Sequence, residues 1–130
     1  ACAKARQQFP AFHFAQLDLT SVSITPTLDT HNSNRRLFMI RGTLWYVFPK
    51  LDIVIDKIRG LMAGSDKLLV VQNFPPLTGP FIGQEVIPNH HALINHFSSA
   101  FSPLRHIWYE DTLKATNDNW FIGFFSIKDK

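Results

Sequence analysis

Residues 35–49 read Arg-Arg-Leu-Phe-Met-Ile-Arg-Gly-Thr-Leu-Trp-Tyr-Val-Phe-Pro, and the apolar start of this stretch breaks abruptly after Ile40. Residues 37–40 are apolar without alternation, which is typical of a strand that is covered on both faces of a sheet. The Arg41-Gly42 pair then marks the carboxyl end of the strand. Because ligands bind at that edge of an open parallel sheet, the stretch predicts a central strand and a site at its end.

An aromatic cluster follows this strand directly and consists of Trp45, Tyr46 and Phe48. Pro49 comes next, and proline is favoured in the first turn of a helix. Since ligand pockets are lined mainly by aromatic and apolar side chains, we interpret the cluster as the wall of a pocket beside a helix entry. The alternative is that these rings only fill the core, as many aromatic residues do.

A helix and a second strand are predicted next. One helical stripe carries the apolar residues Leu51, Val54, Ile55, Ile58, Leu61 and Met62, and Gly64 is a plausible stop. Residues 67–74, Lys-Leu-Leu-Val-Val-Gln-Asn-Phe, form an apolar run that is too short for a helix. A strand, helix and strand at this spacing predict a right-handed parallel crossover, so both strands end at one edge of the sheet. Asn73 at that edge could orient a ligand or form a turn before two prolines.

The rest of the chain predicts one more helix and two more strands. Asn89 is expected to cap a helix whose buried side carries Leu93, Ile94, Phe97 and Phe101, and Ser102-Pro103 is expected to end it. Residues 104–109 and 119–128 are predicted strands, and the short link between them allows only an antiparallel pair. The expected core residues of the last strand are Trp120, Phe121, Phe124, Phe125 and Ile127.

The histidines and the polar connection in the first third of the chain give no metal signal. His90, His91 and His96 lack the i, i+4 spacing of a helical zinc pair, so we expect them on the helix surface or in its first turn. Residues 20–34 are predicted to be a surface connection rich in Ser, Thr and Asn, which could close over a site. Asp29 and His31 in this connection lack a third ligand, so no metal site is expected.

The amino-terminal residues suggest a chain that begins inside a larger domain. Residues 1–8 are good helix formers without a capping signal, so the chain is expected to enter in mid-helix and to be truncated. The helix must end before Pro10. Residues 12–19 alternate in part and are interpreted as a strand that places Asp18 at its end, where the carboxylate could accept from a ligand. The alternative is a loop aspartate that caps its own backbone.

Composition describes one ordinary globular domain over residues 1–130. Apolar residues make up 45% and charged residues 18%, with a net charge of +3. Basic residues are scattered apart from Arg35-Arg36, which argues against nucleic acid as a partner. The single cysteine, Cys2, excludes an internal disulfide. No apolar run approaches the roughly 20 residues of a membrane helix and no signal peptide is recognisable, so a cytoplasmic protein without a membrane partner is expected.

The order of these elements resembles the carboxyl-terminal part of a class I S-adenosylmethionine-dependent methyltransferase over nearly the whole chain. In that family a helix rich in Ala and Arg precedes a strand that ends in Asp, as in residues 12–18. A later strand runs into Gly-x-Leu-aromatic-aromatic and a proline, as in residues 42–49. Residues 119–123, Asn-Trp-Phe-Ile-Gly, look like the family's last, antiparallel strand. The resemblance implies an α/β, Rossmann-like methyltransferase sheet, mostly parallel with a terminal antiparallel hairpin.

The family's cofactor-binding glycines are absent from this chain. Class I methyltransferases hold the cofactor on a Gly-rich turn after their first strand and an acidic residue after their second, whereas the six glycines here contain no Gly-x-Gly. The resemblance therefore implies that the chain lacks the first two strands and the helix between them. A methyltransferase parent is expected, and the chain alone is expected to be inactive.

The resemblance also assigns roles to individual residues. Those implied to contact S-adenosylmethionine are Asp18, at the adenine amine, with Leu19, Arg41, Gly42 and Leu44. Those implied to face the methyl acceptor, which is expected to be a small molecule, are Trp45, Tyr46, Asn73 and Phe74. The general base is open, with Tyr46, His31 and His90 as candidates by location alone.

Two other classes of protein stay open. A non-catalytic α/β binding or interaction module would be indifferent to adenosyl ligands, and a nucleic-acid-binding domain would show salt-sensitive binding to oligonucleotides. A sheet that lacks two strands would also expose an unpaired edge of its central strand. We therefore expect the 130-residue chain to form a homodimer through that edge.

Overall fold

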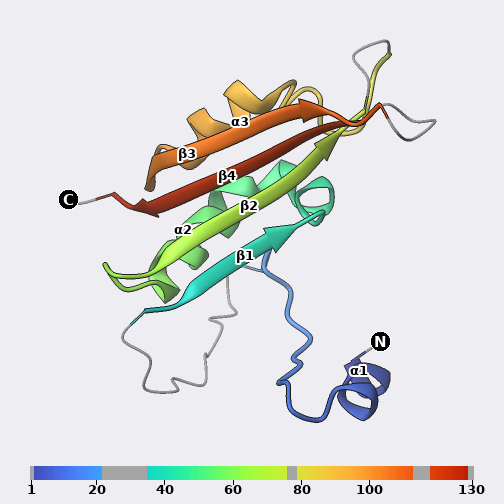
Figure 1. Ribbon diagram of the computed structural model, residues 1–130, viewed down its shortest axis with the longest axis vertical. Helices are drawn as coiled ribbons and strands as arrows, with labels where there is room; N and C mark the ends of the chain where they lie inside the picture. The colour runs from blue at the N-terminus through green and yellow to red at the C-terminus, as the bar shows by residue number, and fades with distance from the viewer. Residues whose placement is uncertain (1, 22–34, 76–78, 113–117, 129–130) are drawn as a thin grey trace.

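The computed structural model describes residues 2–21, 35–75, 79–112 and 118–128 (Figure 1). Its helices are α1 (Cys2–Gln8), α2 (Leu51–Leu61) and α3 (His90–Phe97), and two short 3₁₀ turns, η1 (Leu44–Tyr46) and η2 (Phe48–Lys50), precede α2. Its strands are β1 (Leu37–Arg41), β2 (Lys67–Phe74), β3 (Phe101–Glu110) and β4 (Asn119–Ile127). Most of the predicted polar connection, with Asp29 and His31, lies outside the described residues.

The four strands form one mixed sheet in the order β1-β2-β4-β3. β1 and β2 are parallel neighbours, which confirms the crossover predicted through α2. β4 is antiparallel to β3, as predicted, and it is also antiparallel to β2, because it inserts between β2 and β3. Only one of the three strand pairings in the described sheet is therefore parallel. The described strands do not form the mostly parallel sheet that was expected.

Helix α2 forms where the apolar stripe predicted it and buries that stripe against the sheet. Its buried residues are Leu51, Val54, Ile55 and Ile58. Pro49 lies in η2 immediately before the helix, as predicted. The helix ends at Leu61, earlier than the predicted stop at Gly64, because Met62 takes an extended conformation with ψ of 140°.

Helices α2 and α3 cover the same face of the sheet, and their buried side chains join those of the strands in one core (Figure 1). The Asn89 side chain accepts from the backbone N–H of Ala92, so the predicted cap of α3 is confirmed. From β4 the core receives Phe121 and Phe125, while Trp120, Phe124 and Ile127 are only half-buried. No helix in the described part of the chain is long and apolar enough to span a membrane.

The prediction that β1 is covered on both faces is wrong. Leu37 and Met39 are 58% and 61% exposed, whereas Phe38 and Ile40 are half-buried toward the helices. The reason is that β1 lies at an edge of the sheet and that no described helix covers the face opposite α2 and α3. An apolar run without alternation does not distinguish this arrangement from burial on both faces.

The predicted boundary between α3 and the next strand is also wrong. The helix ends at Phe97, and Phe101 is the first residue of β3. Pro103 lies within the strand, next to a register shift between Pro103 and Arg105. A proline is tolerated there because β3 is an edge strand, paired only with β4 among the described residues.

The predicted strand over residues 12–19 does not form. Helix α1 ends before Pro10, as expected, but the residues that follow run as irregular chain from α1 toward the body of the domain (Figure 1). Phe12 is 66% exposed and Leu17 is 40% exposed. A strand needs a neighbour for its backbone hydrogen bonds, and no described strand lies beside this segment.

Candidate functional site

The carboxyl ends of β1 and β2 lie side by side, as the parallel crossover requires. The N–H of Gly42 donates to the carbonyl of Val71 over 3.0 Å and extends the pairing one residue beyond β1. Gly42 then turns the chain with φ of +62°, a conformation that favours glycine. The Arg41-Gly42 pair therefore ends the strand as predicted.

A pocket of about 510 Å³ borders the end of β1 and the start of α2. It is lined by Leu19, Met39, Ile40, Arg41, Thr43, Leu44, Val47 and Val54. Three of the residues implied to contact the cofactor, Leu19, Arg41 and Leu44, lie in this lining, and Gly42 adjoins it between Arg41 and Thr43. The structure thus brings most of the predicted cofactor residues to one largely apolar pocket.

Asp18 lies next to this pocket in sequence but forms a local turn. Its carboxylate accepts from the hydroxyl of Thr20 at 2.7 Å and from the Thr20 backbone N–H at 2.8 Å. These two bonds, followed by the charges of Lys50 and Lys57, hold the pKa of Asp18 below its ordinary value. The prediction of Asp18 at a strand end is wrong, because its segment has no strand partner.

Residues 19–21 are nevertheless anchored on the body of the domain. The ammonium of Lys57 on α2 donates to the backbone carbonyl of Ser21. Leu19 packs against the core. The segment that carries Asp18 is thereby held beside the pocket at the end of β1.

Three of the four residues implied to face the acceptor meet at the adjoining strand ends. Trp45 Nε1 donates to Asn73 Oδ1 over 3.1 Å. The Trp45 ring packs edge-on against Phe74, with centroids 6.1 Å apart, and against Phe48 at 5.2 Å. Tyr46 is 84% exposed and does not join this group.

The structure adds Phe81 and Trp108, which the sequence did not single out, and it also brings in His90, one of the three candidate bases. Phe81 lies 5.4 Å from Trp45 and 6.4 Å from Phe74, and Trp108 on β3 lies 5.5 Å from Phe74. His90 stacks on Trp108 with ring centroids 4.2 Å apart. The sequence of β3 does not alternate and gives no signal for Trp108, whose position follows from its pairing with the buried Phe121.

His90 lies in the first turn of α3, one of the two predicted positions, and is half-buried there. Burial lowers its pKa below the ordinary value, and the neighbouring His91 and His106 lower it further. The imidazole is therefore neutral at neutral pH and can accept a proton. Of the three candidate bases, His90 is the one that the structure places in the aromatic group, since Tyr46 is exposed and His31 lies outside the described residues.

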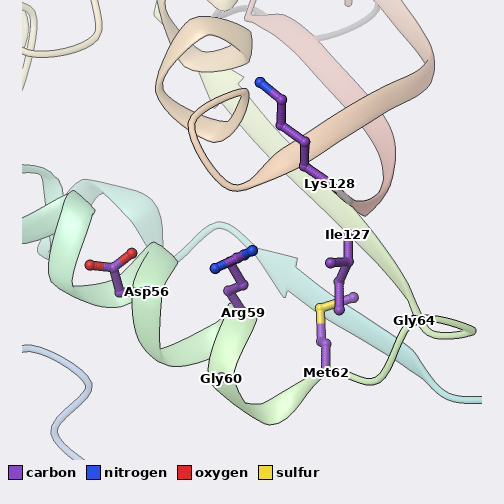
Figure 2. A pocket seen from close by; sticks show the side chains of 7 residues that line it. All are labelled: Asp56, Arg59, Gly60, Met62, Gly64, Ile127 and Lys128. Atoms are coloured by element: carbon purple, nitrogen blue, oxygen red, sulfur yellow. The ribbon is translucent and has the colours of Figure 1, made fainter. Parts of the chain in front are cut away.

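A second pocket, of about 550 Å³, lies at the opposite end of the sheet (Figure 2). Its lining includes Arg59 of α2, whose Nε is buried without a partner in the described part of the chain. Lys128 also lines the pocket, and its ammonium donates to the carbonyl of Ser98 at 3.3 Å (Figure 2). None of the predicted site residues lines this pocket. The described residues also contain no group of three side chains that could hold a metal ion.

The fold matches solved structures with which the chain shares little sequence. N-methyltransferase NodS from Bradyrhizobium japonicum WM9 superposes with a TM-score of 0.66 at 16% identity, covering 98% of this chain and 67% of NodS. NodS in complex with S-adenosyl-L-homocysteine gives 0.66 at 14% identity, covering 98% and 61%. The PH0226 protein from Pyrococcus horikoshii OT3 gives 0.61 at 13% identity, covering 98% and 66%.

These comparisons establish a methyltransferase-like fold. The chain spans about two thirds of the length of the proteins that it matches. Neither a protein-family description nor a curated protein matches the sequence.

Proposed function

We propose that this chain is the carboxyl-terminal part of a class I methyltransferase that moves a methyl group from S-adenosylmethionine to a small-molecule acceptor. The observation that carries the proposal is the pairing of two neighbouring sites. The apolar pocket at the end of β1 adjoins the Trp45–Asn73 pair at the end of β2. The NodS structure that binds S-adenosyl-L-homocysteine has the same fold, which supports this assignment.

The pocket at the end of β1 suits one part of the cofactor. Its walls are mainly apolar, and a Cβ at Gly42 would meet nothing within 4 Å, so the space beside that backbone is open. Arg41, Gly42 and Leu44 would hold the cofactor there, and S-adenosylmethionine supplies the methyl group when bound. The rest of the cofactor would need contacts that a Gly-rich turn gives and that this chain lacks, so we infer that the chain alone is inactive.

The aromatic group at the ends of β2 and β3 suits the acceptor. Asn73 and the ring of Trp45 offer a polar group beside an apolar surface, which can orient a small organic molecule. Holding donor and acceptor in line and excluding water can lower the barrier by roughly 7 to 11 kcal/mol. His90, neutral and stacked on Trp108, is the residue that we assign to take a proton where the acceptor must lose one.

A non-catalytic binding module is the second candidate. The observations that favour it are the absence of any Gly-x-Gly and the engagement of the Asp18 carboxylate by Thr20. Such a module would keep the aromatic group as a binding surface and would not respond to adenosyl compounds.

Calorimetric titration with S-adenosylhomocysteine separates the two. We expect micromolar binding to a version extended at its amino end, and weaker or no binding to the 130-residue chain. Arg41→Ala should weaken binding, whereas Arg105→Ala, an exposed arginine on β3, should not. Absence of binding to the extended version would favour the binding module.

A further inference from the structure

The pocket of about 550 Å³ at the opposite end of the sheet, here called the Arg59 pocket, holds a cation without a partner (Figure 2). Among the described residues, none forms a hydrogen bond or an ion pair with the Arg59 guanidinium. Its Nε is buried, while Arg59 as a whole is half-buried, so the outer N–H groups stay accessible. A charge that is partly withdrawn from water and lacks a partner is stabilised by an anion in contact with it.

Lys128 brings a second cation to the Arg59 pocket from the end of β4. Its backbone N–H donates to the carbonyl of Ala100 at 3.1 Å, which fixes the residue beside the sheet. Its ammonium has three N–H donors and uses one of them on the carbonyl of Ser98. The lining also contains one carboxylate, the exposed Asp56, so it carries two cations against one anion. This balance favours an anionic ligand.

Two apolar side chains form another part of the lining. Met62 follows the end of α2 and is 8% exposed, and Ile127 at the end of β4 is half-buried. Free phosphate would leave this surface uncovered, whereas a ligand with an apolar portion would cover it and gain hydrophobic free energy. The pocket volume lies in the range of small-molecule sites, about 300 to 1,000 Å³. Both observations favour a small organic molecule over an inorganic ion.

A glycine in the last turn of α2 leaves one wall of the pocket without a side chain. Gly60 follows Asp56 by four residues, so both lie on one face of the helix and both line the pocket. Glycine destabilises a helix relative to alanine. Within the described structure, a Cβ at Gly60 would meet nothing within 4 Å, and the backbone there is not left-handed. Gly60 thus contributes open space to the pocket and nothing to the packing of the helix.

We propose that the Arg59 pocket binds a small organic oxyanion, which is a carboxylate or a phosphate ester. The oxygens of the ligand accept from the N–H groups of Arg59 and Lys128, and its apolar portion covers Met62 and Ile127. A planar guanidinium can donate two parallel hydrogen bonds to either group, which sets the orientation of the ligand. The proposal does not depend on methyl transfer, since none of the residues assigned to the cofactor or the acceptor lines this pocket.

A titration followed by NMR of the isotope-labelled 130-residue chain tests the site. The probes are phenylacetate and phenyl phosphate, which join an oxyanion to an apolar ring. We expect saturable shifts of the Arg59 Nε–H signal and of the backbone amide signals of Gly60 and Gly64, which line the pocket. Phenethylamine, with the same ring and a positive charge, should cause no such shift. Inorganic phosphate should bind severalfold more weakly than phenyl phosphate. The probe that binds more tightly distinguishes a carboxylate site from a phosphate ester site.

Substitutions separate ligand binding from the stability of the fold. Arg59→Met removes the guanidinium and keeps an extended side chain, so it should weaken binding by about tenfold or more. Arg105→Met makes the same change at an exposed arginine of β3 outside the pocket and should leave the affinity unchanged. Gly60→Leu should weaken binding by a similar factor because its side chain fills the pocket. Its urea midpoint should stay equal or rise, because leucine favours a helix.

The proposal is overturned if neither probe causes a saturable shift, because the pocket would then hold only water. An affinity that survives both Arg59→Met and Gly60→Leu in folded protein would also overturn it, since the binding would take place elsewhere. The same titration on a version extended at its amino end should give the same affinity. Binding that is lost in that version would overturn the proposal, because the rest of the protein would cover the pocket.

Discussion

The indole N–H of Trp45 donates to the side-chain oxygen of Asn73 across 3.1 Å, joining residues 28 positions apart. Trp45 lies in the turn after β1, and Asn73 lies near the end of β2. Because the two strands are parallel neighbours, this bond ties together the two strand ends that form the candidate site.

Removal of this bond should destabilise the domain modestly. In Asn73→Ala the half-buried Trp45 N–H loses its acceptor, so the free energy of unfolding should fall by about 1 kcal/mol. Urea denaturation measures this change. Asn95→Ala, an exposed asparagine in α3, is the control and should cause no loss. Equal midpoints for the two variants would mean that the Trp45–Asn73 bond contributes no net stability.

The contact between Trp45 and Asn73 follows from a pattern that the sequence contains. Two short apolar runs separated by an amphipathic helix imply parallel strands with their ends at one edge. The pattern does not reveal Phe81, because this residue lies in the loop between β2 and α3 and no local periodicity places it. Nor does it reveal that His90 stacks on Trp108, a contact between α3 and β3 that depends on tertiary packing.

The two wrong predictions for strands share a physical cause. Whether Leu37 and Met39 are covered depends on a second layer over the sheet, and whether residues 12–19 form a strand depends on a neighbouring strand. Neither depends on the local sequence. Local pattern therefore predicted elements and their directions, while the coverage of the sheet and the placement of Asp18 required the structure.

Alanine substitutions at Gly42, Gly64 and Gly83 distinguish the cost of backbone strain from the cost of steric overlap. Gly64→Ala should be nearly neutral, because its Cβ would meet nothing within 4 Å and its backbone is not left-handed. Gly42→Ala should cost about 1 kcal/mol from its φ of +62° alone. Gly83→Ala should cost about 3 kcal/mol or more, because φ is +86° and the new Cβ would overlap the ring of Phe48. Thermal or urea unfolding should rank the three variants in this order, and a neutral Gly83→Ala would contradict the packing of Phe48.

The ionised carboxylate of Asp66 is expected to stabilise the folded protein, and this stabilisation should be lost in acid. Burial would raise its pKa, but hydrogen bonds from Arg36 and from the Ala63 backbone N–H outweigh burial and leave the pKa below its ordinary value. Because the folded pKa is the lower one, the ionised carboxylate stabilises the fold fully above the unfolded pKa of about 3.9. This contribution is lost as the pH falls through the folded pKa.

The variant Asp66→Asn should therefore lose about 3 kcal/mol at pH 7, since Arg36 keeps its charge but loses its carboxylate partner. Urea unfolding over a pH series should show the gap between wild type and variant closing below about pH 4. Asp52→Asn, at a carboxylate that is 85% exposed, is the control and should show no comparable gap. A constant gap across the series would contradict the role of the ionised carboxylate.

The stack on Trp108 should be visible in the titration of His90. Burial, and then His91 and His106, lower the folded pKa, so the His90 proton signal should have its midpoint below about 6.5. The neutral ring contributes stability that is lost as the pH falls from the unfolded pKa toward the folded one. Trp108→Ala should move the midpoint upward by exposing the ring. Ile107→Ala, on the opposite face of β3, should leave it in place, and equal shifts in both variants would contradict the contact.

Asp18 offers the sharpest test of the cofactor assignment, because its carboxylate already binds Thr20. If the carboxylate also accepts from the adenine amine, Asp18→Ala should weaken S-adenosylhomocysteine binding by about tenfold or more in a form of the protein that binds it. Thr20→Val removes the hydroxyl that Asp18 holds and keeps the carboxylate, so it should weaken binding much less. Calorimetry compares the two, with Asp56→Ala, an exposed carboxylate of α2, as control. Equal losses in both variants would limit Asp18 to shaping the turn, and unchanged affinity in Asp18→Ala would remove it from the site.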